Sequence, residues 1–281
     1  MATTDAPRGV LVLVGTPIGN LDDLTPRAAA ALATADVIAC EDTRRTGRLL
    51  AHLGIAAPKL LVANDHTEAE VAPDVVERIA AGQKVAVVTD AGMPGISDPG
   101  ELLVRATLDA GFTVEVVPGP SALDTALVLS GLPAGRFCFE GFLPRKGSAR
   151  RARLETIALE QRTVLLYEAP HRVHRTVGDL RDVCGDDRQI AILRELTKLH
   201  EEHWRGSLAD ADAMLDDRSP RGEYVLVVAG AEPPVSADDA TLLAALEAER
   251  AAGRSTRDAV AEVAQRFGEP HRRVYDLAIL D

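Results

Sequence analysis

Aromatic residues, cysteines and long apolar runs are all scarce in this sequence of 281 residues. Phe, Trp and Tyr make up 3% of the chain, so we do not expect any nucleic-acid contact to rest on a broad platform of stacking rings. Cys40, Cys138 and Cys184 lie far apart without metal-ligand spacing, which predicts buried thiols in a reducing compartment. The apolar run at Val10–Val14 is too short for a signal peptide or a membrane span. We therefore expect a cytoplasmic protein with no membrane partner.

The sequence also lacks an excess of basic residues and the usual signatures of metal and nucleotide sites. It holds 31 Lys and Arg against 43 Asp and Glu, for a formal net charge of -12, so a nucleic-acid partner requires a local concentration of positive charge. The histidines lack a spacing such as H-E-x-x-H, which predicts no metal site. Residues 15–20 match neither a P-loop nor a G-x-G-x-x-G fingerprint, and residues 95–97 do not form a G-x-S-x-G turn. These absences argue against nucleoside-triphosphate, dinucleotide and serine-hydrolase chemistry.

What the sequence does contain is a regular alternation of strand-like and helix-like segments. Short apolar runs rich in β-branched residues are separated by amphipathic segments that end at glycines. This alternation predicts an α/β fold with a mainly parallel sheet covered on both faces. Strands are expected at 10–14, 37–40, 60–63, 84–89 and 113–117, with helices starting at Pro26 and spanning 45–53, 71–81 and 101–110.

A second αβ set follows the rigid turn Pro118-Gly119-Pro120, and a polar helical tail follows Pro233-Pro234. Further strands are expected at 137–142, 163–167, 189–194 and 223–228, and further helices at 149–160, 172–183, 238–252, 256–267 and 270–279. We therefore expect an N-terminal αβα domain over residues 1–119, a second αβα domain over 120–232 and a small helical module over 233–281. The short helices of the tail resemble a helix-turn-helix unit.

Glycine-rich loops follow three of the expected strands. They are Gly-Thr-Pro-Ile-Gly-Asn at 15–20, Asp-Ala-Gly-Met-Pro-Gly-Ile-Ser-Asp-Pro-Gly at 90–100 and Pro-Gly-Pro-Ser-Ala at 118–122. In parallel α/β sheets, ligands bind beyond the carboxyl ends of the strands, where such loops lie. Glycines let a ligand approach the main chain closely, and Asp90 and Asp98 add carboxylates for an ammonium group or a ribose hydroxyl. Together the loops predict a ligand site at this edge of the sheet.

With Glu41-Asp42-Thr43-Arg44 and Glu168-Ala-Pro-His-Arg172, these loops resemble the tetrapyrrole methylase superfamily and, more narrowly, the ribosomal small subunit methyltransferase I family. The residues that follow Asp90, Ala-Gly-Met-Pro, favour the rRNA branch over corrin-precursor relatives. The resemblance implies two αβα domains with S-adenosylmethionine in the cleft between them, a homodimer and no metal. It further implies methylation of the ribose 2′-oxygen of a cytidine in small-subunit (16S) rRNA, with ribosomal RNA or the small ribosomal subunit as partner.

The resemblance also assigns site residues. Those expected to bind the cofactor are Gly15, Pro17, Asp90, Met93, Gly95, Ser121 and Ala122, with Leu166 and Tyr167 on the far wall. Methyl transfer from a sulfonium is an in-line displacement, so the enzyme chiefly aligns the reactants. A ribose hydroxyl is a poor nucleophile, so a base or cationic helper is expected, with Glu41, Asp42, Glu168 and His171 as candidates. The structural alternatives are helix N-terminal carboxylates for Glu41 and Asp42, and salt-bridged scaffold for Glu168 and His171.

Positive charge is concentrated in one stretch, residues 145–153, called here the basic segment. It reads Arg-Lys-Gly-Ser-Ala-Arg-Arg-Ala-Arg and contains no acid. The residues expected to contact RNA phosphates are Arg145, Lys146, Arg150, Arg151 and Arg153, joined by Arg172 and Arg175. The alternative is the solvated start of a helix.

Two other functions stay open at this stage. A small-molecule (corrin-precursor) methyltransferase of the same superfamily would use the same cofactor site but would not need the basic segment. A non-catalytic RNA-binding assembly factor would keep the fold and lack affinity for the cofactor.

Overall fold

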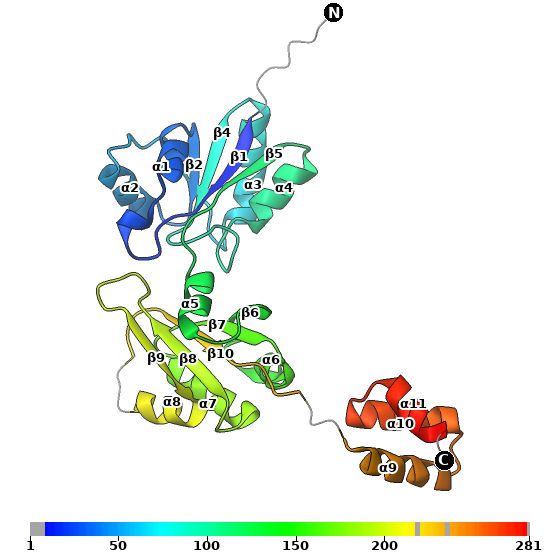
Figure 1. Cartoon of the computed structure of the whole chain (residues 1–281). Helices are drawn as coiled ribbons and strands as arrows, with labels where there is room; N and C mark the ends of the chain where they lie inside the picture. Colours follow the sequence, from blue (N-terminus) through cyan, green and yellow to red (C-terminus); the bar gives the residue numbers. More distant parts are fainter. Residues whose placement is uncertain (1–8, 217–219, 234–236, 280–281) are drawn as a thin grey trace, which may run out of the picture. The chain divides into compact units, whose positions relative to one another are not determined.

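The computed structural model describes residues 9–216, 220–233 and 237–279. The chain divides into two compact units, residues 1–229 and 230–281. The first unit contains two five-stranded sheets, and the second contains helices (Figure 1). The predicted α/β class with two sheets and C-terminal helices is confirmed, whereas the predicted domain boundaries at residues 119 and 232 stay predictions.

The first sheet is parallel throughout, with the strand order β3-β2-β4-β1-β5. Its elements are β1 (Val10–Val14), the 3-10 helix η1 (Leu21–Asp23), α1 (Pro26–Ala33), β2 (Val37–Cys40), α2 (Thr43–His52), β3 (Lys59–Val62), α3 (Glu68–Ala80), β4 (Lys84–Val88), α4 (Glu101–Asp109) and β5 (Thr113–Val117). Successive side chains of a strand point to opposite faces. In β1, Val12 and Val14 accordingly pack with α1 and α2, while Leu11 and Leu13 pack with α3 and α4.

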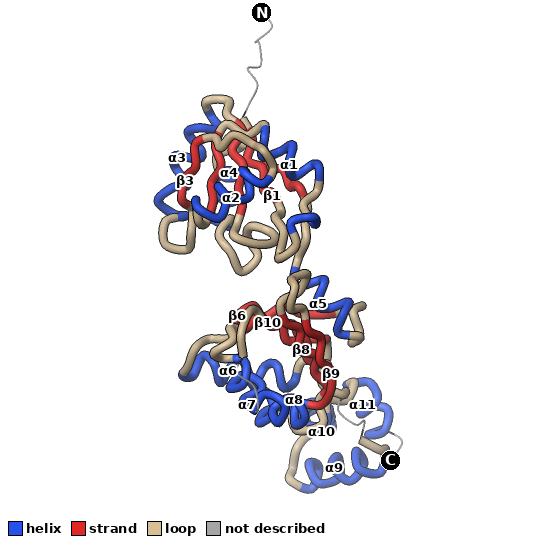
Figure 2. The backbone as a smooth tube through the Cα atoms, turned by 90° about the vertical axis from the view of Figure 1, so that its left-hand side faces the viewer, coloured by secondary structure: helices blue, strands red, loops and turns tan. Residues whose placement is uncertain are grey.

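The second sheet is mixed, with the order β6-β7-β10-β8-β9. Its elements are α5 (Ala122–Ser130), β6 (Phe137–Phe142), α6 (Gly147–Leu159), β7 (Thr163–Glu168), α7 (Val173–Cys184), β8 (Gln189–Arg194), β9 (Glu202–Ser207), α8 (Leu208–Asp216) and β10 (Tyr224–Val228). β6 and β7 are parallel, and the other neighbouring strands are antiparallel. Helices α6, α7 and α8 cover one face and α5 covers the other (Figure 2).

The predicted strands and helices all have counterparts in the structure, with ends that differ by a few residues. The elements that were not predicted include η1, β9 and α8. β9 is an edge strand that reads Glu-His-Trp-Arg-Gly-Ser, and within it only Trp204 packs against the core. An edge strand with so little apolar character gives no periodic signal. The mainly parallel sheet expected from the strands up to residue 117 is confirmed, and the sheet of the second αβ set is mixed.

The C-terminal unit is a three-helix cluster around its own small core. It comprises α9 (Asp239–Ala251), α10 (Thr256–Phe267) and α11 (His271–Ile279), as the sequence predicted. Asp238 and Ser255 cap α9 and α10 by accepting main-chain hydrogen bonds. No helix in the described part of the chain has the length and apolar character needed to cross a bilayer.

Candidate functional site

Main-chain hydrogen bonds join the loops that follow β1 and β4. Thr16 N donates to Gly92 O over 2.9 Å, and Gly92 N donates to Thr16 O over 3.1 Å. The hydroxyl of the buried Thr16 donates to the carbonyl of Thr89, just beyond β4. These bonds fix two of the glycine-rich loops against each other at the carboxyl edge of the first sheet.

Gly15 and Gly119 bring the loop after β5 into main-chain contact with the loop after β1. A Cβ atom on Gly15 would lie 2.6 Å from Gly119 Cα and 2.6 Å from Met93 Sδ. A Cβ atom on Gly119 would lie 2.8 Å from the main chain of Gly15. Both positions therefore require glycine, and all three loops meet at this point.

The long loop (residues 90–100) contains strained backbone. Gly95 and Gly100 have φ angles of 83° and 139°, and Ser97 has a φ of 58° although it carries a side chain. Gly95 N donates to Pro99 O over 3.0 Å and closes the loop on itself. A non-glycine residue in the left-handed region is unfavourable, and such residues cluster at functional sites.

A cavity of about 390 Å³ opens at these loops, within the range of small-molecule sites. Elements associated with both sheets contribute to its wall. The sequence-predicted residues that line it are Asp90, Met93, Ser121, Ala122 and Tyr167 from the cofactor set, and Glu41 and Glu168 from the catalytic set.

Four residues expected to bind the cofactor do not line the cavity. Gly15 and Gly95 shape the main chain behind it, and Pro17 precedes the lining residue Ile18. Leu166 is fully buried in the core under α6, α7 and α8. Its neighbour Tyr167 packs on the α5 face, because adjacent residues of a strand point to opposite sides.

The cavity also contains residues that the sequence analysis did not select. They include Arg45, Ser97, Phe142, Leu196, Glu223, Tyr224 and Val225. Asp98, which the sequence analysis named as a possible ligand carboxylate but placed in neither the cofactor nor the catalytic set, also lines the cavity. Glu223 gave no local signal, since it reaches the site only because β10 pairs between β7 and β8.

The lining is strongly acidic. Its carboxylates are Glu41, Asp90, Asp98, Glu168 and Glu223, and Arg45 is the one Lys or Arg among the described lining residues. Arg45 Nε lies 3.3 Å from Asp90 Oδ2, whereas Asp90 Oδ1 is buried with no hydrogen-bond partner in the described structure. Burial raises the pKa values of Glu41 and Asp90. Among the described residues, no group of three or more His, Cys, Asp or Glu is arranged to hold a metal ion. An acidic lining of this kind suits a cationic ligand.

The four candidate catalytic residues fall into two groups. Glu41 and Glu168 line the cavity, and Glu41 Oε2 accepts a 3.3 Å hydrogen bond from the main chain of the long loop. Asp42 instead caps α2, where it accepts a 2.7 Å hydrogen bond from Arg44 N. The hydrogen bonds from Arg44 lower the pKa of Asp42. His171 is exposed and outside the lining. The geometry therefore supports the helix-cap alternative for Asp42.

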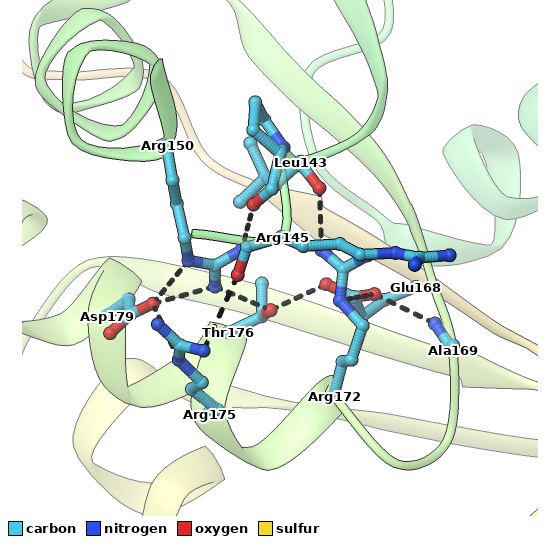
Figure 3. Close-up of polar contacts among 10 residues, drawn as sticks. Leu143, Arg145, Arg150, Glu168, Ala169, Arg172, Arg175, Thr176 and Asp179 are labelled. Atoms are coloured by element: carbon cyan, nitrogen blue, oxygen red, sulfur yellow. Dashed lines mark hydrogen bonds and ion pairs between the residues drawn. The ribbon is translucent and has the colours of Figure 1, made fainter. Parts of the chain in front are cut away.

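Glu168 is the buried end of a polar network that reaches the basic segment (Figure 3). Its Oε1 lies 3.1 Å from Arg172 Nε, and its Oε2 accepts from Thr176 Oγ1 over 2.6 Å. Thr176 Oγ1 accepts from Arg150 Nη2 over 2.9 Å. Arg150 Nε also donates to Asp179 Oδ2 over 2.7 Å. Glu168 is therefore fully engaged by protein donors.

Three successive carbonyls before α6 each accept a hydrogen bond from a different arginine. The pairs are Leu143 with Arg172, Pro144 with Arg150 and Arg145 with Arg175, at 2.6, 3.1 and 3.5 Å (Figure 3). Each of these arginines also pairs with Glu168 or Asp179. The start of the basic segment is thus tied to the wall of the cavity.

The residues expected to contact RNA differ in exposure. Arg145, Lys146, Arg151 and Arg153 are exposed, and Arg153 Nε also lies 3.1 Å from Glu140 Oε2. Arg172 is half-buried against Glu168. Arg150 is 3% exposed, on the face of α6 that also buries Leu154 and Ile157. The expected phosphate contact of Arg150 does not fit this position, because the helical period turns it toward the core.

Comparison with known proteins identifies the family to which the chain is similar. Residues 10–212 match the model of the Tetrapyrrole (Corrin/Porphyrin) Methylases. The chain is 44% identical over 273 residues to "Ribosomal RNA small subunit methyltransferase I" of Synechocystis sp., with 96% of this chain and 98% of that protein covered. It is 48% identical over 273 residues to the protein of the same name from Mycobacterium tuberculosis, with 96% and 95% covered.

Solved structures share the fold. The methyltransferase CobJ matches with a TM-score of 0.60 and 25% identity, over 79% of this chain and 94% of that chain. A uroporphyrin-III C-methyltransferase from Thermus thermophilus, complexed with S-adenyl homocysteine, matches with a TM-score of 0.54 and 21% identity, over 79% and 97%.

Proposed function

We propose that this chain, which belongs to the ribosomal RNA small subunit methyltransferase I family of the tetrapyrrole (corrin/porphyrin) methylases, methylates the ribose 2′-oxygen of a cytidine in 16S rRNA. The methyl donor is S-adenosylmethionine. The observation that carries the proposal is the acidic cavity at the carboxyl edge of the parallel sheet, with the basic segment tied to its wall.

The residues of the cavity fit this donor. When bound, S-adenosylmethionine supplies a methyl group on a positively charged sulfonium. The carboxylates of the lining favour such a charge, and Asp90 Oδ1 is a buried acceptor that lacks a partner in the described structure. Asp90, Met93, Ser121 and Ala122 would hold the donor, with Tyr167 opposite them.

The main contribution of the chain to catalysis is alignment. The contacts among Thr16, Gly92, Gly15 and Gly119 fix the loops against one another. Preorganised walls hold nucleophile and methyl carbon in line and exclude bulk water, which removes entropic cost from the displacement. Glu168 stabilises the wall, because both of its oxygens are engaged by protein donors.

Four exposed cations support an RNA substrate in an otherwise acidic chain. Arg145, Lys146, Arg151 and Arg153 lie at the start of α6. Contacts of such side chains with phosphates position an RNA without reading its bases. We further propose that the protein acts as a homodimer in the cytoplasm, as its resemblance to the family implies.

The test combines the purified protein, S-adenosylmethionine with a radiolabelled methyl group, and small ribosomal subunits that lack the modification. We expect label in 16S rRNA and one new site that resists alkaline cleavage, because a 2′-O-methyl group removes the hydroxyl that attacks the adjacent phosphate. Free 16S rRNA in a parallel reaction shows whether the assembled subunit is needed.

Two outcomes would contradict the proposal. Donor binding without label in rRNA would favour a small-molecule substrate, such as a corrin precursor. Absence of donor affinity would favour a non-catalytic assembly factor.

A further inference from the structure

Asp98 differs from the other carboxylates of the cavity in having no donor of its own. The pairs elsewhere are Glu41 with Asp90 N, Asp90 with Arg45, Glu168 with Arg172, and Glu223 with Lys198. The charges of four other carboxylates, Glu41, Asp65, Asp90 and Glu223, act on Asp98. Within the described structure, both oxygens of Asp98 are therefore left for a ligand, whereas Asp90 pairs with Arg45 through Oδ2 and leaves only Oδ1 without a partner.

The backbone around Asp98 holds it in place. Ser97, directly before it, adopts a left-handed φ of 58°, and the Gly95–Pro99 hydrogen bond of 3.0 Å encloses both residues. A Cβ atom on Gly141 of β6 would lie 3.3 Å from Ser97 Oγ, so the loop also packs closely against the second sheet. Local strain of this kind persists only where the surroundings enforce it.

We propose that Asp98 is the general base of the methyl transfer and accepts the proton of the ribose 2′-hydroxyl. This inference rests on the function proposed above. As the hydroxyl oxygen bonds to the methyl carbon, the carbon–sulfur bond breaks and its electron pair stays on sulfur. The hydroxyl proton passes to a carboxylate oxygen of Asp98. The sulfonium charge and the carboxylate charge are both neutralised, so charge balances across the step.

Electrostatics favour this role at neutral pH. Burial, followed by the charges of Glu41, Asp65, Asp90 and Glu223, raises the pKa of Asp98 to about 7. A general base works best when its pKa is near the working pH. Tyr167, whose own pKa is raised to about 12 by burial and by Asp98, stays neutral beside it. A cationic donor in the cavity would favour the ionised form of Asp98.

The first test compares Asp98→Asn with the parent protein. We expect kcat to fall by at least about 100-fold at pH 7.5, while the Kd of S-adenosylmethionine from calorimetry changes by less than about threefold. In the parent, kcat should rise with pH, pass through a midpoint near the pKa of Asp98 and reach a plateau at higher pH. Calorimetry near pH 7 in buffers of different ionisation enthalpy should detect proton release on donor binding in the parent and none in Asp98→Asn.

The matched control is Asp65→Asn, which removes an exposed like charge from outside the cavity lining. The loss of this charge should lower the pKa of Asp98 and move the kcat midpoint to lower pH, with an unchanged plateau. This shift tests the proposal even if Asp98→Asn does not fold.

Three results would overturn the proposal. Asp98→Asn with kcat within threefold of the parent removes Asp98 from the proton transfer. A tenfold weaker donor affinity with normal kcat at saturation makes Asp98 a donor-binding residue instead. A parent that binds donor but does not methylate ribose fails the proposed function itself, and the role of Asp98 falls with it.

Discussion

The carboxylate of Glu68 accepts a hydrogen bond of 2.8 Å from Gly100 N, across 32 residues of chain. The same oxygen accepts from Leu102 N and Leu103 N over 2.9 and 3.2 Å. Gly100 is the N-cap of α4 and has no side chain to cap that helix, so the buried Glu68 does so from α3. The long loop that ends at Gly100 is thereby anchored to α3.

Glu68→Ala should loosen the long loop. We expect the free energy of unfolding to fall by about 2 kcal/mol, since hydrogen bonds to a charged acceptor are lost, and the donor Kd to rise about tenfold. For Glu68→Gln, both the free energy of unfolding and the donor Kd should lie between those of the parent and those of Glu68→Ala. The amide oxygen still accepts hydrogen bonds, but the charge at the helix N-terminus is gone. Calorimetry and urea unfolding measure both quantities. Glu70→Ala, which removes an exposed carboxylate from the first turn of the same helix as Glu68, serves as control. Normal donor affinity in Glu68→Ala would show that the anchor does not serve the site.

Gly119→Ala should disrupt the site through its backbone. The new methyl group would lie 2.8 Å from the main chain of Gly15, so the loops after β1 and β5 must separate. We expect at least tenfold weaker donor binding and about 1–3 kcal/mol lower stability. Gly135→Ala is the control, because a Cβ atom there meets nothing within 4 Å. Equal donor affinities in the two variants would refute the close contact.

Neighbouring arginines of α6 should respond oppositely to mutation. Arg150→Met removes the buried partner of Asp179 and the donor to Thr176, which should lower stability by about 3 kcal/mol in urea unfolding. Arg151→Glu should leave stability within about 0.5 kcal/mol and weaken RNA binding, more so at low salt. Filter binding at two salt concentrations checks the second effect. A stable Arg150→Met protein, or unaltered RNA affinity in Arg151→Glu, would contradict these roles.

Local sequence patterns were enough to predict the first sheet and the loops at its edge. The buried runs of β1 and β4 and the glycines of the long loop carry their information within a few residues. The conformations of these segments depend on β-branched packing and on glycine, which are properties of the residues themselves.

Other parts of the site depend on tertiary placement. Glu223 lies in the cavity because β10 is inserted between β7 and β8, and Glu68 caps a helix that starts 33 residues later. The sequence predicted that Arg150 is exposed with the other cations of the basic segment. In α6, however, Arg150 lies on the same helix face as the buried Leu154 and Ile157. Such contacts between residues far apart in the sequence cannot be predicted from local sequence patterns.

Asp98→Asn should stabilise the protein more at pH 8 than at pH 5. The pKa of Asp98 is raised to about 7 in the folded chain, above its unfolded value, so its stabilising contribution is present at low pH and lost as pH rises through 7. Removing the titrating group should raise the free energy of unfolding at pH 8 by about 1 kcal/mol, after allowance for solvent screening. Thermal unfolding at both pH values measures this difference. If Asp98→Asn changed the free energy of unfolding equally at pH 5 and pH 8, the pKa of Asp98 would not be raised in the folded chain.

Mass spectrometry of nucleosides tests the central claim most directly. Unmodified small subunits are incubated with the protein and S-adenosylmethionine, and their 16S rRNA is then digested to nucleosides. We predict about one new 2′-O-methylcytidine per rRNA molecule, and none when the donor is omitted. A methyl group on a base, on another nucleoside, or on no nucleoside of the rRNA would contradict the account.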